Sequence, residues 1–269
     1  MTPRQRFLLI LPGLLFVVAF GSFELGRWGG ERMAERRHAA ARDSRASDLT
    51  QDDDALVKML LAQDLEERSF AFSDVVTASA GRALHPFDPA AAPFATVLAA
   101  ISSAADEVVK LHNLDSSPVR ALRRINEASR FFEDDLRRKI DAHPALFCTI
   151  PHTSDGSGQR SGYPDLRIEH VESGTVVYLD PKLFEQGHRD SSLRTFYYTP
   201  RNRSSKVRDD ASHLLLGISH DGNDGQWTFN GWELVDLASL QVRLKAEFHA
   251  SNRDLYQDEA RVAGSPRRE

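Results

Sequence analysis

Residues 163–182 read YPDLRIEHVESGTVVYLDPK, and this stretch decides the fold of the chain. Alternating apolar and polar residues come first, the turn-forming segment VESG (171–174) follows, and the β-branched and aromatic run TVVYL (175–179) closes the pattern. A turn in the middle of VESG sets Leu166 opposite Leu179. The stretch therefore predicts a β-hairpin with one apolar face.

The polar face of this hairpin brings together three ionisable side chains. Asp165 lies opposite Asp180, and Lys182, two residues further on, projects to the same side because strand side chains alternate. A shift of the turn by one residue on each strand sets Asp165 opposite Lys182 and leaves the face unchanged. Two carboxylates and an ammonium suit the binding of a divalent cation and a water beside a phosphodiester. The competing interpretation is an ordinary exposed acid and a solvated Asp–Lys pair.

Pro164-Asp165 and Asp180-Pro181-Lys182 resemble the motif of the PD-(D/E)XK nuclease superfamily, over roughly residues 118–256. The resemblance implies that Asp165 and Asp180 bind Mg²⁺ (or Mn²⁺), that Lys182 orients or activates the attacking water, and that no small-molecule cofactor is used. The Pro181 carbonyl is a candidate third oxygen ligand. Because a proline removes a donor from the ladder, the strand is expected to end or bulge at Asp180.

The segments before the hairpin also fit this superfamily. Ser117-Pro118 is a helix-start signal, apolar residues then recur at helical spacing, and Pro144 stops the helix. A short apolar run at 145–150 predicts a buried strand. The first helix of the superfamily often carries a glutamate that reaches the metal, and Glu133 is the candidate here. A plain surface role for Glu133, beside two further acids, is the alternative.

Basic residues around the hairpin are candidate DNA contacts. The polar loop at 151–162 and the segment at 189–208 contribute them, and a solvated positive loop is the alternative for both. Residues 195–199 predict a strand whose tyrosines stack on bases or pack in the core. The candidate nucleic-acid-binding residues are Arg160, Arg194, Arg201, Arg203, Lys206 and Arg208.

The C-terminal part completes an α/β pattern. Residues 209–216 are ambiguous between helix and strand, residues 226–237 predict a strand, and residues 240–248 predict a helix. His213 and His220 lie near Asp221 but match no strong zinc spacing. A net charge of −5 argues against wholesale wrapping of DNA, so a nuclease here needs a local basic groove. The single cysteine excludes an internal disulfide framework.

The N-terminus carries an uncharged apolar segment at residues 7–23. Its length suffices to span a bilayer, although a cleaved signal peptide is the alternative. Arginines are more numerous after the segment than before it, which favours a single-pass anchor with a cytoplasmic main body. Cleavage and export is the alternative localisation.

These patterns predict an α/β protein with a restriction-endonuclease-like core of helix, mixed central sheet and flanking helix. The expected domains are an anchor (1–26), a helical linker region with a helical hairpin from 55–80 and 94–111 (27–115), a nuclease-like domain (116–258) and a disordered tail (259–269). The expected function is metal-dependent hydrolysis of DNA at a membrane, compatible with a homodimer. An inactive nuclease-fold scaffold and an unrelated periplasmic domain are the alternatives.

Overall fold

The computed structural model describes residues 53–65, 67–156, 158–191, 196–200, 205–245, 247, 249–255, 257 and 262–263. The chain divides into two units, 1–65 and 66–269. The described part of the first unit holds helix α3 (Asp53–Leu61), which exposes Leu56, Met59, Leu60 and Leu61. The predicted span at 7–23 lies outside the described residues, as does most of the predicted tail.

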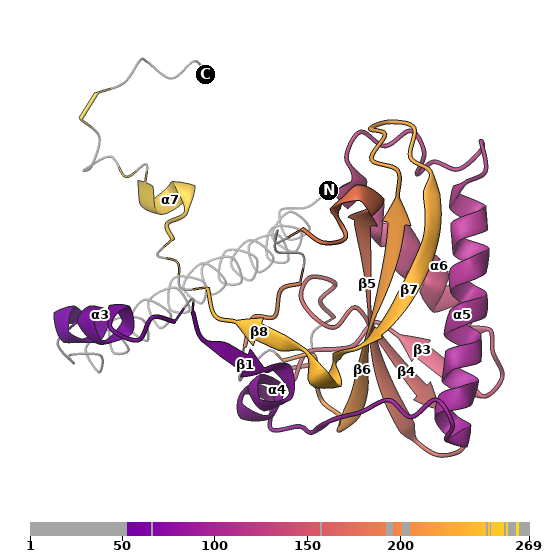
Figure 1. Cartoon of the computed structure of the whole chain (residues 1–269), viewed down its shortest axis with the longest axis horizontal. Coiled ribbons are helices and arrows are strands. Elements are labelled where there is room, and N and C mark those ends of the chain that lie inside the picture. The colour runs from indigo at the N-terminus through magenta and orange to yellow at the C-terminus, as the bar shows by residue number, and fades with distance from the viewer. Residues whose placement is uncertain are drawn as a thin grey trace, which may run out of the picture. The chain divides into compact units, whose positions relative to one another are not determined.

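The second unit is built on a mixed six-stranded sheet (Figure 1). Its strands run in the order β2 (Leu84–His85), β6 (Ala211–His220), β5 (Thr175–Glu185), β4 (Leu166–His170) and β3 (Leu146–Thr149). Strand β7 (Phe229–Asp236) pairs with β6 beyond the short β2. The β5–β6 and β2–β6 pairs are parallel and the others are antiparallel. The predicted mixed central sheet with flanking helices is confirmed.

The hairpin forms with the predicted register. Leu166 pairs with Leu179 and Ile168 with Val177 across β4 and β5. The turn relies on Gly174, whose φ of 69° is a conformation that L side chains rarely adopt. All four apolar side chains are fully buried, so the alternation in sequence has become one core-facing surface.

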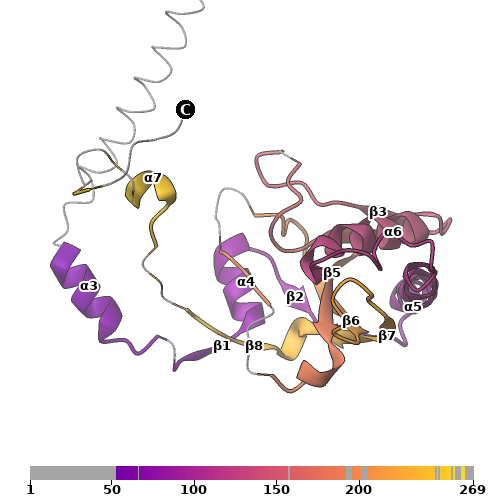
Figure 2. The same cartoon turned by 90° about the horizontal axis from the view of Figure 1, so that it is seen from above.

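Two helices cover this apolar face of the sheet, α5 (Ala92–His112) and α6 (Ser129–Asp141) (Figure 2). The buried residues of α5 recur every three or four positions, which places them on one stripe: Val97, Ile101, Ala104, Ala105 and Val108. By length and composition α5 would also be able to cross a membrane. Its buried stripe accounts for that apolar composition, so α5 carries no argument about localisation.

The opposite face is covered over part of its area by α4 (Phe72–Ala80) and the ribbon of β1 (Ser69–Ala71) and β8 (Gln241–Arg243). Phe72 is fully buried there and meets the rings of Tyr163, Phe196 and Tyr198 edge-on. The rest of this face, along the C-terminal part of β5, carries the polar residues of the candidate site.

The helix predicted from Ser117 begins later. Residues 117–122 form successive turns, η1 (Ile125–Glu127) follows, and α6 starts at Ser129. The indole N–H of Trp227 donates to the Leu122 carbonyl at 2.6 Å. That carbonyl would accept the bond from Asn126 in a continuous helix, so a tertiary contact takes its place.

Two further predictions are wrong. Residues 196–199 form no strand, because Phe196 and Tyr198 turn into the second core cluster. No helix covers the described part of 240–248. The Leu240 carbonyl instead accepts from the Phe72 amide at 2.9 Å, and β8 pairs with β1. The ambiguous segment at 209–216 belongs to β6, and the strand predicted at 226–237 is β7.

The remaining elements are short. They are η2 (Gln186–His188), η3 (Leu237–Ser239) and α7 (Asn252–Leu255). The segment at 55–80 is divided among α3, β1 and α4 rather than forming one helix. Helix α5 packs against α6 and the sheet and belongs to the same unit as the core.

Candidate active site

The candidate site lies where β4 and β5 part. Asp165 immediately precedes β4, and Asp180 follows the last β5 residue that pairs with β4. The Lys182 ammonium lies 2.5 Å from Asp180 Oδ2 and 3.4 Å from Asp165 Oδ2. The structure thus brings together the two carboxylates and the ammonium that the sequence assigns to one face.

Burial shifts the pKa values of the ionisable side chains in this cluster. The Asp180 side chain is only 2% exposed, and burial, followed by the neighbouring Asp165 carboxylate, raises the pKa of Asp180 well above its usual range. Burial lowers the pKa of Lys182, but the two carboxylates outweigh burial and the net pKa is raised. Lys182 is therefore a fixed positive charge at neutral pH.

Glu133 belongs to the same electrostatic environment. It projects from the first half of α6 and is partly buried. Burial, with a further contribution from Asp165, raises the pKa of Glu133 to about 7, while Lys182 and Arg160 act to lower it. The structure thus places Glu133 in electrostatic contact with the cluster rather than on a remote surface.

Pro181 neither ends nor bulges the strand, contrary to the sequence expectation. Strand β5 continues to Glu185, and from Asp180 onward it pairs with β6 alone, with Pro181 opposite Leu216. The backbone nitrogen of Pro181, which carries no N–H, therefore faces the edge of β5 at which β4 no longer pairs. Its carbonyl points the same way and lies 3.4 Å from the Lys182 ammonium, on the side of the cluster.

The donors fit a hard cation of the Mg²⁺ type. Within the described residues, no three His, Cys, Asp or Glu side chains are arranged to hold a metal by themselves. Mg²⁺ does not require that, because it usually takes one or two carboxylates and keeps several waters. Asp180 Oδ2 is buried and receives no well-directed hydrogen bond from the described residues, despite the nearby ammonium. Asp165, Asp180 and the Pro181 carbonyl are the groups that could hold the ion.

The residues predicted to contact DNA differ in their exposure and in their contacts. Arg160 is partly exposed and pairs with Asp134 of α6 at 2.6 Å, and Arg208 is exposed. Lys206 is only 3% exposed, and its ammonium donates to three backbone carbonyls. A phosphate cannot replace those bonds without unburying the side chain, so the prediction for Lys206 is corrected. Arg194, Arg201 and Arg203 lie outside the described residues.

The two histidines of β6 do not share a zinc site. His213 and His220 are seven residues apart on one strand, which separates them by about 23 Å at 3.3 Å per residue and turns them to opposite faces. His213 is buried beside Tyr163, whose hydroxyl lies 2.6 Å from His213 Nδ1. Burial lowers the pKa of His213 to about 3, so this ring is neutral.

Sequence reasoning named Lys206 and His213 for other roles and missed that both support the segment before Asp165. Lys206 and His213 both contact the segment that precedes Asp165, from positions more than forty residues away in the chain. The signal that could have found them is weak: a lysine next to a valine, and a histidine inside an apolar run.

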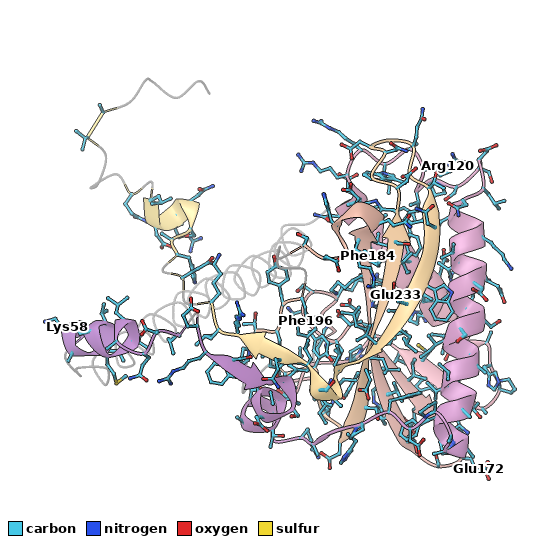
Figure 3. All side chains as sticks on the ribbon, in the orientation of Figure 1. Lys58, Arg120, Glu172, Phe184, Phe196 and Glu233 are labelled. Carbon is cyan, nitrogen blue, oxygen red and sulfur yellow. The ribbon has the colours of Figure 1, made fainter. Side chains whose placement is uncertain are left out.

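A cavity of about 500 Å³ adjoins the Lys182 side of the cluster. Lys182, Gly217 and Glu233 lie side by side across β5, β6 and β7, and Phe184 covers Gly217. Phe184 and Glu233, which both line this cavity, are labelled in Figure 3. Arg189 forms two hydrogen bonds to the Glu233 carboxylate, at 2.7 and 3.1 Å. The cavity is thus lined by residues of β5, β6 and β7 and includes Lys182 of the cluster.

Comparison with protein families identifies the class of protein. Residues 63–259 match the family described as Type II restriction enzyme MjaV family. The match covers well over half of the sequence, and the chain belongs to this family. Glu133, Asp165, Asp180 and Lys182 all lie within the matched range.

A particular relative is the Type II restriction enzyme MjaV of Methanocaldococcus jannaschii. The two chains are 26% identical over an alignment of 211 residues, which covers 74% of this chain and 91% of the relative. The relative is thus matched over nearly its whole length.

Proposed function

We propose that this chain is a metal-dependent endonuclease that hydrolyses DNA phosphodiester bonds, with an active site of the PD-(D/E)XK type. The observation that carries the proposal is the convergence of Asp165, Asp180 and Lys182 at the point where β4 and β5 part. Membership of a restriction enzyme family supports DNA as the substrate.

In the proposed mechanism, Asp165 and Asp180 hold the cation, with the Pro181 carbonyl as a further oxygen ligand. A bound Mg²⁺ or Mn²⁺ would polarise the scissile phosphate and lower the pKa of a bound water. Lys182 keeps its proton because its pKa is raised. It therefore donates a hydrogen bond that orients the attacking water, and its charge stabilises the transition state. Glu133, with a pKa near 7, is suited to accept a proton from a water in the site.

DNA binding is proposed along the open sheet face beside Lys182. Arg160 and Arg208 are exposed on this unit, and Arg189 borders the cavity. Arg194, Arg201 and Arg203 are proposed as additional phosphate contacts on the grounds of their sequence position alone. Arginine suits this role because its planar group binds phosphate through two hydrogen bonds.

The test is cleavage of supercoiled plasmid by the full-length protein purified in detergent. The parent should nick and linearise DNA in Mg²⁺ or Mn²⁺ and lose this activity in EDTA. Lys182→Ala should reduce cleavage roughly 100-fold or more, since it removes a group that acts in the transition state. Lys139→Ala is the matched control, because Lys139 pairs with Glu107 away from the site.

Equal activity of parent and Lys182→Ala would contradict the proposal and indicate a contaminant or another site. Binding of DNA that is indifferent to EDTA, without any cleavage, would favour the alternative of an inactive nuclease-fold scaffold.

We also propose that residues 7–23 anchor the chain in a membrane, with the main body in the cytoplasm. The proposal rests on the uncharged span and the arginines that follow it. The protein should pellet with membranes, and a C-terminal reporter that is active only in the cytoplasm should give a signal. A soluble protein trimmed at its N-terminus and found outside the cytoplasm would overturn both statements.

A further inference from the structure

The Lys206 ammonium forms an unusual set of contacts. It donates to the carbonyls of Arg160 at 3.1 Å, Gly162 at 2.5 Å and Pro164 at 2.9 Å. A lysine ammonium has three N–H donors and no acceptor, so all of its hydrogen-bonding capacity is used by these carbonyls. Burying an ammonium is costly unless its donors are satisfied, and here they are satisfied by backbone alone.

The three carbonyls belong to the segment that leads directly into Asp165. They come from alternate residues, and the last of them is joined by its peptide bond to Asp165 itself. Gly162 has a φ of 86°, a conformation that suits glycine and allows the chain to present its carbonyl to the lysine. Lys206 therefore fixes both the path of the segment and the point at which β4 begins.

Two other contacts hold the same segment from other sides. The Arg160 side chain pairs with Asp134 at 2.6 Å, and the Tyr163 hydroxyl lies 2.6 Å from His213 Nδ1. These contacts fix side chains, whereas Lys206 fixes the backbone. The charge of Lys206 also interacts favourably with Asp165, Asp180 and Glu133.

We infer that Lys206 is a positioning residue of the cation site, which holds residues 160–164 so that the Asp165 carboxylate stays opposite Asp180. Lys206 acts through the backbone and touches neither the substrate nor the cation. This inference rests on the proposed function for the identity of the site, but the structural part of it can be tested separately.

Arginine and methionine substitutions separate positioning from DNA binding. Lys206→Met leaves three carbonyls without their donor. Lys206→Arg keeps the charge, but its planar fork does not match three converging carbonyls, so it should behave like the methionine variant. A lysine that contacts phosphate would instead tolerate arginine, since both side chains bind phosphate.

The first readout does not depend on any enzyme activity. Trypsin cleaves after Arg160, whose carbonyl is one of the three that Lys206 binds. The native full-length protein in detergent should be cut slowly at Arg160–Ser161, and both Lys206 variants should be cut at least several times faster there. Arg208→Met is the matched control, an exposed cation two residues away, and it should be cut at the parent rate.

The second readout is Mn²⁺ affinity, measured from the free-ion signal in electron paramagnetic resonance. Loss of a supporting contact typically weakens metal binding about 10- to 100-fold, and both Lys206 variants should fall in that range. The affinity for DNA in EDTA and its salt dependence should equal those of the parent. Circular dichroism confirms folding, and Lys206→Gln, which retains two donors, replaces any variant that does not fold.

Unchanged trypsin cutting and unchanged Mn²⁺ affinity in both variants would overturn the inference. So would a DNA-binding salt slope that falls by about one charge in Lys206→Met and is restored in Lys206→Arg, because that result identifies a phosphate contact. If the parent itself binds no Mn²⁺ and cuts no DNA, the proposed function fails, and the trypsin readout still decides whether Lys206 holds the segment.

Discussion

Two clusters of charged side chains begin two residues apart, at Asp165 just before β4 and at Arg167 within it, and they differ in how well their charges are balanced. In the first, Arg167 binds both oxygens of Asp209 at 2.8 and 3.1 Å and Glu169 at 2.6 Å. The Tyr178 hydroxyl donates to the same Asp209 carboxylate at 2.7 Å. Hydrogen bonding to Arg167 holds the pKa of Asp209 below its usual range, so this cluster favours the folded chain.

The second cluster contains Asp165, Asp180 and Lys182, and it shows the opposite behaviour. The pKa values of Asp180 and Glu133 are raised, mainly by burial, which means that folding disfavours their charged forms. The difference teaches that proximity of opposite charges does not by itself indicate a structural ion pair. A cluster whose carboxyl pKa values are raised in the absence of a cation is a candidate functional site. A cluster whose charges are fully paired is a candidate source of stability.

The largest effect that separates the two clusters is expected from Asp180→Asn. The amide keeps the shape of the side chain but removes a ligand charge, so cleavage should fall roughly 100-fold or more. The metal-free variant should be at least as stable as the parent at pH 8, because it no longer buries a strained carboxylate. Single-turnover cleavage and urea unfolding in EDTA provide the two measurements, and a variant with full activity would remove Asp180 from the site.

Arg167→Met should give the reverse pattern. A hydrogen bond to a charged group contributes about 1.5–3 kcal/mol when it is fully buried. The three bonds of Arg167 are partly exposed to solvent, which weakens them, so the free energy of unfolding should drop by about 2 kcal/mol in total. Cleavage per folded molecule should stay within a few-fold of the parent. Urea unfolding and cleavage at a temperature where the variant is fully folded check both statements. A large loss of cleavage with unchanged stability would show that Arg167 belongs to the site.

A smaller effect is expected from pH in the metal-free protein. Glu133 has a folded pKa of about 7 against an ordinary 4.5, so its contribution to stability is complete below pH 4.5 and is lost as the pH rises towards 7. After allowance for solvent screening the loss should be about 1–2 kcal/mol. Unfolding in EDTA at pH 5 and pH 8 measures it, with Glu133→Gln as the control that should reduce the dependence and leave the part contributed by the raised pKa of Asp180. Greater stability at pH 8 than at pH 5 would contradict the direction given for Glu133.

The smallest effect is expected from Gly162→Ala. The position has a φ of 86°, and an added Cβ meets no atom within 4 Å, so only backbone strain of about 1 kcal/mol applies. Gly231→Ala is the matched control, because it has equally open space and an ordinary φ, and it should change stability little. Equal melting temperatures for the two variants would show that the segment before Asp165 adjusts freely.

The sequence was most informative where its signals were local. The register of β4 and β5 follows from a short turn and two alternating strands, so the meeting of Asp165, Asp180 and Lys182 could be derived without a structure. The parallel pairing of β5 with β6 could not, because the two strands are joined by a long connection and no local pattern specifies it.

Three of the failures share a physical origin in backbone carbonyls that bind side chains or amides distant in the chain. The Trp227 indole donates to the Leu122 carbonyl, and α6 begins later than predicted. The Phe72 amide donates to the Leu240 carbonyl, which favours β8. The Lys206 ammonium is buried because it donates to three further carbonyls. A basic residue in a polar segment is ordinarily exposed, so the burial of Lys206 becomes visible only when the segment at 160–164 is placed beside it.

Pro181 has a consequence for how this protein behaves in the company of other chains. A strand that loses its neighbour half-way exposes a row of backbone groups, and such an edge is a template for pairing with a foreign strand. From Asp180 onward, the open edge of β5 lacks one of those donors and carries charges on both sides of the gap. An incoming strand would find no N–H at Pro181 and would have to cover the Asp180–Lys182 ion pair. The missing N–H of Pro181, a residue whose carbonyl is proposed to bind the cation, therefore disfavours pairing of a foreign strand beside the site.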